Sequence, residues 1–203
     1  NLSVAGGYAS AWPRDISESH TENRSGAALI SIQPPGTPSV GQAMLEAHGE
    51  TGDPLFRQGA REAAGALMWC QLASGGWGSD FSFEPKFARR YHYRRDLDAG
   101  DLDPGKRSRR SSLDDNKSQS AIRFLMQLAN SPAGADDPAL RQALDFAWDG
   151  LLGAQAPNGA WGQMFSNPAD PEMPVEKASF PVEWSRTFPN VDYTSYYTLN
   201  DNN

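Results

Sequence analysis

A short glycine–aromatic element that occurs three times along the chain is the feature that most constrains its fold. The three copies are Gly6-Gly7-Tyr8, Gly75-Gly76-Trp77 and Gly159-Ala160-Trp161. Gln71 precedes the second copy, and Gln155 precedes the third copy at the same distance. Self-similarity at such intervals is the signature of a repeat architecture, in which each unit buries its apolar face only against its neighbours.

A helix is expected before each of the last two copies. Asp53-Pro54 and Asp137-Pro138 each combine a capping aspartate with a proline in the first turn, where its missing N–H is harmless. After the second of these starts, apolar residues recur at helical spacing and form one stripe. The residues of that stripe are Leu140, Leu144, Ala147, Trp148, Leu151 and Leu152.

Each of these helices has a partner before its Asp-Pro start, around residues 40–47 in the first unit and 121–128 in the second. The unit is therefore a helix, a short turn, a second helix and a long irregular segment, with short extended pieces expected at 28–32 and 81–83. Helix pairs joined in this way stack into solenoids or close into α/α toroids. We predict a single all-α domain over residues 1–203, an incomplete α/α toroid whose long segments gather at one end.

The composition argues against some classes of function. A formal net charge of −7 disfavours non-specific binding to nucleic acid, which needs a broad cationic surface. No apolar run approaches the roughly 20 residues that cross a bilayer, so no membrane association is expected. The single cysteine, Cys70, lies in the apolar stretch 66–70 and is expected to be a buried thiol, which leaves no disulfide framework.

Two oxygen-rich clusters stand where helices are expected to begin. They are Asp114-Asp115-Asn116 and Asn200-Asp201-Asn202. Ca²⁺ takes carboxylate and carbonyl oxygens as ligands, and two clusters at equivalent repeat positions favour a binding role. The alternative is that both clusters cap helices, for which the same residue types are preferred.

A run of basic residues is interleaved with tyrosines, and it comprises Arg89, Arg90, Tyr91, His92, Tyr93, Arg94 and Arg95. Arginine binds carboxylates through two parallel hydrogen bonds, so the run suits an anionic sugar chain whose pyranose rings stack on the tyrosines. The alternative is a solvated loop balanced by the aspartates that follow it. Residues 96–111 form a charged loop insertion, and no role is assigned to it.

Trp77 and Trp161 follow small residues, and the glycines among them permit tight backbone turns. One interpretation is that the two indoles pack between helices and mark the repeat. The other is that they face a cleft and serve as platforms for sugar rings.

The third repeat carries two motifs in succession, Gly159-Ala160-Trp161-Gly162-Gln163 and Thr198-Leu199-Asn200-Asp201, and Ser112-Leu113-Asp114-Asp115 looks like a second version of the latter. They resemble the Gly-Trp-x-Gln and Thr-Phe-Asn-Asp motifs of the polysaccharide lyase family 10 pectate lyases, with Leu199 where phenylalanine is usual. The resemblance covers residues 60–203, and residues 1–59 more loosely. The chain is therefore expected to be the N-terminal part of such an enzyme, ending before its catalytic machinery is complete.

The resemblance implies an α/α toroid that cleaves polygalacturonate by calcium-assisted β-elimination, with an arginine as base and a secreted or periplasmic location. Arg186 is the candidate catalytic residue, with an ion pair to Glu183 or Asp192 as the alternative. The candidate substrate-binding residues are Arg89, Arg90, Tyr91, Arg94, Trp77 and Trp161. The candidate Ca²⁺ ligands are Asp114, Asp115 and Asp201.

Two other functions compete with this one. A non-catalytic helical-repeat module would bind sugar without cleaving it, which suits a chain that lacks the base. A terpene cyclase or prenyltransferase of α/α-toroid type also repeats glutamine and Gly-x-Trp elements between helices, but the basic run and the Asn-Asp helix start fit it poorly. The protein is expected to be a monomer whose partner is an acidic polysaccharide.

Overall fold

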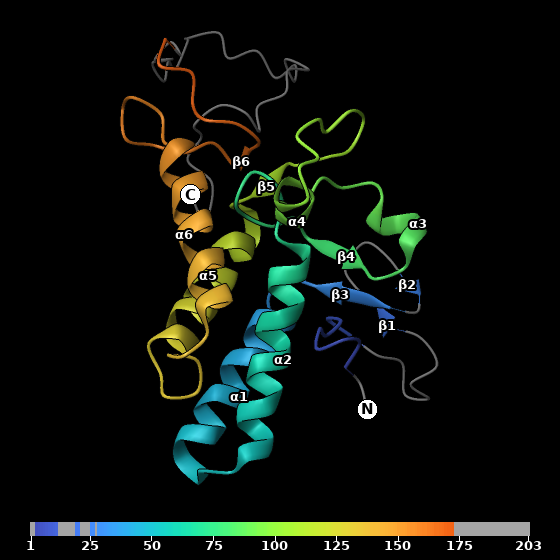
Figure 1. Ribbon diagram of the computed structural model, residues 1–203, viewed down its shortest axis with the longest axis vertical. Helices are drawn as coiled ribbons and strands as arrows, with labels where there is room; N and C mark the ends of the chain where they lie inside the picture. Colours follow the sequence, from blue (N-terminus) through green and yellow to red (C-terminus); the bar gives the residue numbers. More distant parts are fainter. Residues whose placement is uncertain (1–2, 12–18, 21–24, 27, 173–203) are drawn as a thin grey trace, which may run out of the picture.

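Two helical hairpins form the frame of the molecule (Figure 1). The computed structural model describes residues 3–11, 19–20, 25–26 and 28–172. The first hairpin consists of α1 (Thr37–Thr51) and α2 (Pro54–Cys70), and the second of α5 (Lys117–Ala129) and α6 (Pro138–Gly153). α1 packs along α2 and also contacts α5, which in turn packs on α6. Among the described residues, no helix has the length and apolar character needed to span a bilayer.

The second helix of each hairpin begins as the Asp-Pro pairs predict. The Asp53 carboxylate accepts a hydrogen bond from the backbone N–H of Leu55 (2.8 Å), and the Asp137 carboxylate accepts one from the N–H of Ala139 (3.0 Å). These bonds satisfy N–H groups that have no partner within the helix. The predicted pairing of helices and the predicted helix starts are therefore confirmed.

The prediction of an all-α fold, and with it the α/α toroid, is wrong. Helices dominate, but the described residues also form three two-stranded antiparallel sheets, so the fold is a mixture of α and β structure. The sheets pair β1 (Ser19–His20) with β2 (Ser25–Gly26), β3 (Leu29–Ser31) with β4 (Asp80–Ser82), and β5 (Ser111–Ser112) with β6 (Met164–Phe165). Strands of two or three residues are too short to show the alternation by which a strand is recognised in a sequence. The extended pieces expected at 28–32 and 81–83 do correspond to β3 and β4.

The strands connect successive repeats. The second and third glycine–aromatic turns are followed by β4 and β6 respectively, and each of these strands pairs with the strand that leads into the preceding helical hairpin. Ile32 donates its backbone N–H to the Ser79 carbonyl (2.8 Å), and Leu113 donates to the Gln163 carbonyl (2.8 Å) in the same way. The sheets thus bring the long segments of neighbouring units together at one end of the helices, while both hairpin turns lie at the other end (Figure 1).

The glycine–aromatic turns themselves have one geometry. Gln71 donates its side-chain amide to the Gly75 carbonyl (2.8 Å), and Gln155 donates to the Gly159 carbonyl (2.7 Å). Both glycines have positive φ, which disfavours any residue with a Cβ. The indole of Trp77 donates to the Leu67 carbonyl (2.9 Å), and that of Trp161 donates to the Leu151 carbonyl (2.7 Å). The predicted repeat is therefore confirmed in atomic detail.

The first two turns also dock in the same way on a helix. A Cβ added to Gly6 would lie 2.1 Å from the Glu62 carbonyl oxygen of α2, and one added to Gly75 would lie 2.8 Å from the Phe146 carbonyl oxygen of α6. Glu62 and Phe146 occupy the same place in their helices, counted from the first proline of each. Each turn therefore packs on the second helix of the hairpin that follows it.

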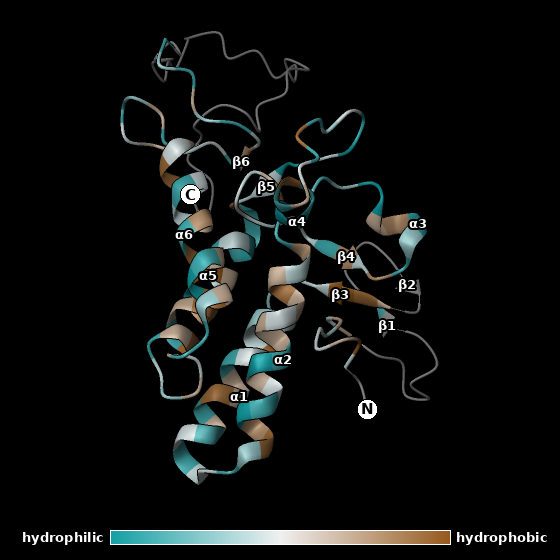
Figure 2. Ribbon diagram, in the orientation of Figure 1, coloured by the Kyte–Doolittle hydropathy of each residue, from teal (hydrophilic) through white to brown (hydrophobic). Residues whose placement is uncertain are grey.

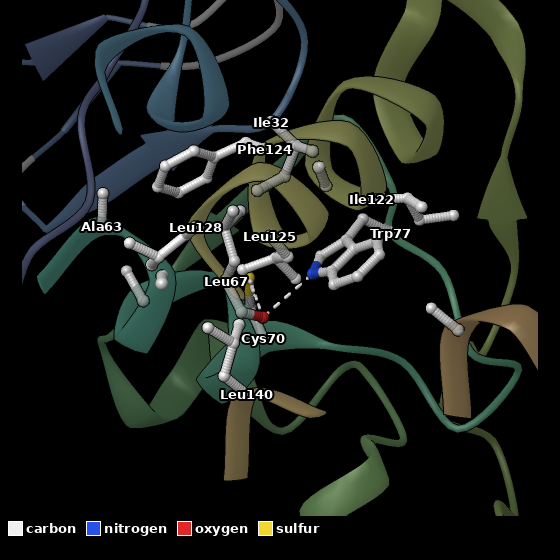
Figure 3. Packing of buried hydrophobic residues seen from close by; sticks show 14 of the residues in the cluster. Ile32, Ala63, Leu67, Cys70, Trp77, Ile122, Phe124, Leu125, Leu128 and Leu140 are labelled. Atoms are coloured by element: carbon white, nitrogen blue, oxygen red, sulfur yellow. Dashed lines mark hydrogen bonds between the residues drawn. The ribbon is translucent and has the colours of Figure 1, made fainter. Parts of the chain in front are cut away.

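A single hydrophobic core lies between the two hairpins and the β3–β4 sheet. Figure 3 shows Leu67 and Cys70 of α2 facing Phe124, Leu125 and Leu128 of α5, with the Trp77 indole closing one side. All of these side chains are 0% or 1% exposed. β3 is among the most hydrophobic segments of the chain (Figure 2), which is consistent with the burial of its three residues.

Replacing Trp77 with alanine is expected to lower the free energy of unfolding by about 3–5 kcal/mol, the usual cost of emptying a buried aromatic site. The matched control is Trp161→Ala, because that indole makes the equivalent hydrogen bond but is only half-buried. Its loss should be clearly smaller. Urea unfolding followed by circular dichroism measures both losses, and equal losses would contradict the assignment of Trp77 to the core.

The thiol of Cys70 is expected to be inert in the folded protein. The side chain is 0% exposed, and burial raises the pKa of the thiol well above its ordinary range, so the reactive thiolate does not form near neutral pH. Iodoacetamide should label Cys70 in urea but leave it unlabelled in native buffer, as mass spectrometry would detect. Rapid labelling of the native protein would show that this part of the core opens.

Candidate functional site

The segments that carry Trp77, Asp114 and Trp161 lie beside one another at the loop end of the helices. Ser112 of β5 donates its backbone N–H to the Trp77 carbonyl (2.8 Å), and β5 pairs with β6, which follows Trp161. Arg186 and Asp201 lie outside the described residues, so their roles stay predictions. The described part of the site therefore consists of two neighbouring regions, the aspartate turn before α5 and a pocket formed by the basic run.

The aspartate turn is a short 3₁₀ segment, η1 (Asp114–Asn116), in which Asp115 and Asn116 both have left-handed backbone conformations. The ammonium group of Lys117, the first residue of α5, lies 3.5 Å from Asp114 Oδ2 and 3.2 Å from Asp115 Oδ2. Lys117 is only 4% exposed. The turn is therefore a compact cluster of two carboxylates with a buried lysine as their partner.

A cavity of about 330 Å³ lies between Arg110, the end of α6 and the segment 162–170. The guanidinium of Arg109, just before β5, donates a hydrogen bond to the side-chain oxygen of Asn167. The two arginines thus bring positive charge to the end of the β5–β6 sheet at which β5 begins.

The basic run forms a second cavity of about 330 Å³, here named the aromatic–arginine pocket. Its walls come from the end of α2, from the segment after β4 that contains α3 (Pro85–Ala88), and from α4 (Arg94–Asp98). The residues that define it are Trp69, Phe83, Arg89, Tyr91, Tyr93, Arg95 and Arg107.

Arg95 is the central side chain of this pocket. Its guanidinium carbon lies 3.8 Å from the ring centroid of Trp69 and 3.7 Å from that of Tyr93, and the guanidinium donates a hydrogen bond to the Trp69 carbonyl. Stacking on aromatic faces holds a guanidinium in one orientation without removing its charge. The pocket therefore presents a fixed cation against aromatic walls.

Tyr93 supplies a polar group to the same pocket. Its hydroxyl is buried and has no hydrogen-bond partner among the described residues. Burial raises the pKa of Tyr93, so the hydroxyl stays protonated and is a donor. A buried donor without a partner is costly, and a ligand oxygen in the pocket would relieve that cost.

Arg107, near the C-terminal end of the charged segment 96–111, also lines the pocket. Its guanidinium lies 2.8 Å from Asp101 Oδ2 and 3.5 Å from Asp96 Oδ2, and the hydrogen bond from Arg107 lowers the pKa of Asp101. The segment 96–111 thus begins inside α4 and ends in β5, and ion pairs hold it against the pocket. It lines the site, although no role was predicted for it.

The predicted substrate-binding residues separate into three groups. Arg89 and Tyr91 line the aromatic–arginine pocket, whereas Arg90 stacks on Phe87 and Arg94 pairs with Asp98 at 3.7 Å. Trp77 is fully buried in the core, so its predicted role as a sugar platform is wrong and its alternative, packing as a repeat landmark, is correct.

Trp161 is half-buried, and its indole nitrogen is engaged by Leu151.

Two residues of the site were not predicted. Trp69 lies in a stretch that indicated only core, and Lys117, directly after the Asp114-Asp115-Asn116 cluster, had no predicted role. A lysine at the first position of a helix, two residues after a pair of aspartates, is the pattern that indicates the Lys117 ion pairs, because such a lysine is otherwise disfavoured there by the helix dipole.

Comparisons with known proteins give a fold and no close relative. No family model matches the sequence, and no curated protein matches it. Two solved structures match. The first is a family 10 polysaccharide lyase from Cellvibrio cellulosa, with a TM-score of 0.52 and 19% identity over 79% of this chain. The second is a mutant of that lyase in complex with trigalacturonic acid, with a TM-score of 0.53 and 17% identity over 79% of this chain. The fold of this chain therefore resembles that of the family 10 polysaccharide lyases, and the structural relationship is a distant one.

The match covers 46% and 47% of those two chains. This chain thus spans about half the length of the lyases that it resembles. The similarity concerns the fold alone, because identity below about a quarter leaves function to the residues of the site.

The ion pair of Asp101 with Arg107 is expected to make stability depend on pH. Because Arg107 lowers the pKa of folded Asp101 below its ordinary value of 3.8, the stabilisation is complete above that value and is lost as pH falls through the folded pKa. Arg107→Gln should therefore destabilise the protein more at pH 7 than at more acidic pH, where only its hydrogen bonds to the Asp103 and Pro104 carbonyls are lost. Urea midpoints across this range test the expectation, with Asp101→Asn as the matched control; a loss that is independent of pH would contradict it.

Proposed function

We propose that this protein is a polysaccharide-lyase-like protein that binds an acidic polysaccharide and cleaves it by β-elimination, with polygalacturonate as the first candidate substrate. The aromatic–arginine pocket is the observation that carries this proposal. It gathers three guanidinium groups on aromatic walls in a chain whose net charge is −7. A local concentration of positive charge, in a chain whose net charge is negative, suits an anionic ligand with flat faces.

Each group of the pocket has a part in binding a uronide. Arg89 is exposed at the pocket wall and is able to form paired hydrogen bonds with a sugar carboxylate. Tyr91, which is partly exposed at the pocket wall, offers its ring to a pyranose ring. The Tyr93 hydroxyl is a buried donor for a ring or hydroxyl oxygen.

The proposed reaction removes the proton from the carbon next to a uronide carboxylate. The electron pair left on that carbon forms a carbon–carbon double bond as the glycosidic oxygen leaves and takes up a proton. Arginine side chains paired with the carboxylate stabilise the negative charge that develops there. Arg186, outside the described residues, stays our candidate for the base, because the resemblance implies an arginine in that role.

Calcium is implied by the resemblance, at Asp114, Asp115 and Asp201. The described part of this site does not fit a divalent cation, because the ammonium of Lys117 already lies against both aspartates. The described residues also contain no group of three or more histidine, cysteine, aspartate or glutamate side chains that could hold a metal. No step of the proposed reaction is therefore derived from a metal ion. A monomeric state and a secreted or periplasmic location also remain proposals.

A non-catalytic sugar-binding module is the second candidate. It is favoured by one observation: the groups that line the aromatic–arginine pocket donate hydrogen bonds, and its one carboxylate, Asp96, is paired with Arg107. Such a pocket binds an anion without supplying a proton acceptor of its own.

Replacing Arg89 with alanine is expected to weaken binding of polygalacturonate oligomers roughly fivefold to tenfold, the loss of one charge-assisted contact. The control is Arg57→Ala, which removes an exposed arginine at the opposite end of α2 and should leave affinity unchanged. Isothermal titration calorimetry measures both variants. Equal affinities for Arg89→Ala and the unaltered protein would remove the pocket from the binding site.

Cleavage is tested by incubating the protein with polygalacturonate and following the ultraviolet absorbance of the unsaturated product. Accumulation of that product supports the lyase. Binding without product supports the module, and the absence of both binding and product would overturn the proposed function.

A further inference from the structure

Lys117 occupies an unusual position for a lysine. Its side chain is 5% exposed, and it is the first residue of α5, where the positive end of the helix dipole disfavours a cation. A buried ammonium group is stable only when opposite charges surround it. Asp114 and Asp115 supply those charges, at 3.5 Å and 3.2 Å from Nζ.

The two aspartates differ from the lysine in exposure. The side chains of Asp114 and Asp115 are 23% and 40% exposed, so solvent reaches the carboxylates from outside while the ammonium lies beneath them. The turn places both carboxylates on the same side of the lysine because Asp115 and Asn116 are left-handed in succession. The cluster has one excess negative charge once the lysine is counted.

This arrangement conflicts with a divalent cation at the turn. Ca²⁺ needs six to eight oxygen ligands at about 2.3–2.6 Å, and its affinity follows the number of negative charges among them. A calcium ion bound to the Oδ2 atoms of the two aspartates would lie within a few ångströms of the ammonium that contacts the same atoms, and the two cations would repel each other.

We propose that Lys117 is the resident cation of the aspartate turn: its ammonium takes the place of a divalent metal ion between Asp114 and Asp115, so that this end of the protein binds acidic polysaccharide without calcium. The first half of the proposal concerns metal binding alone. The second half rests on the proposed function. Lys117 is a positioning residue here, because it fixes the two carboxylates and does not itself contact the sugar.

The test is a calorimetric titration with CaCl₂ alone, on the unaltered protein, on Lys117→Met and on the double variant Lys117→Met/Asp115→Asn. Methionine keeps most of the volume of the lysine stem, and the partly exposed aspartates remain hydrated when the ammonium is removed. The unaltered protein should bind no calcium at the turn. Lys117→Met should bind it at least about tenfold more tightly, and the added Asp115→Asn should abolish that gain, since ligand charge sets calcium affinity.

Calcium binding by the unaltered protein that disappears in Asp115→Asn would overturn the proposal, as would a folded Lys117→Met variant with no gain. Circular dichroism establishes whether that variant is folded. If it is not, the titration of the unaltered protein and of Asp115→Asn still decides the matter, because binding that depends on Asp115 excludes a resident lysine.

Polygalacturonate binding with and without EDTA separates this proposal from the proposed function. Equal affinity in both conditions supports the metal-independent site. Affinity that is lost in EDTA and restored by calcium would overturn the role of Lys117 while leaving the polysaccharide function standing. Failure to bind polygalacturonate at all would overturn the function and the second half of the proposal, whereas the calcium titration would still test the first.

Discussion

The hydrogen bond from a tryptophan indole back to a helix carbonyl is the interaction on which the rest of the structure depends. Carbonyl groups near a helix end lack partners within the helix, and Leu67 of α2 obtains one from the Trp77 indole. The bond fixes the direction of the chain as it leaves the helix, so that β4 meets β3 in a single register. Trp161 repeats the bond at Leu151, which makes the tie a property of the repeat.

This tie also positions the aromatic–arginine pocket. The turn after α2 offers free backbone groups, and the basic run aligns with them: Arg94 donates its N–H to the Gln71 carbonyl (2.9 Å), and Ala73 donates to the His92 carbonyl (3.0 Å). Tyr93 is thereby held opposite Leu72, with its ring against the end of α2. The turn after α2, which packs against the core, therefore also supports the aromatic–arginine pocket. This explains why structural and binding residues alternate along the basic run 89–95.

The sequence predicted the elements whose signals are local and periodic. Asp53-Pro54 and Asp137-Pro138 marked helix starts by their own chemistry, and the spaced glycine–aromatic copies marked the repeat. The β5–β6 sheet could not be predicted in this way, because two-residue strands are selected by pairing with distant segments and not by their own pattern. The same limit applied to the site: Arg89 and Tyr91 were recognised from composition, but their separation from Arg94 depends on how α4 turns.

Burial decides what the charges of this chain do. Asp101 and Arg107 lie near the surface, where water screens them, so their pair orders a segment without contributing much stability. Lys117 is buried, and there the same kind of pair becomes a constraint, because removing either partner leaves a charge that must find another. In this chain of net charge −7, the Lys117 ammonium beneath two aspartates neutralises negative charge that would otherwise bind a metal ion. Arg95 stacks on aromatic rings instead, so its positive charge remains available to an anionic ligand. The positions of the buried cations, and not their number, therefore separate the part of this surface suited to an acidic sugar from the part where a metal ion is disfavoured.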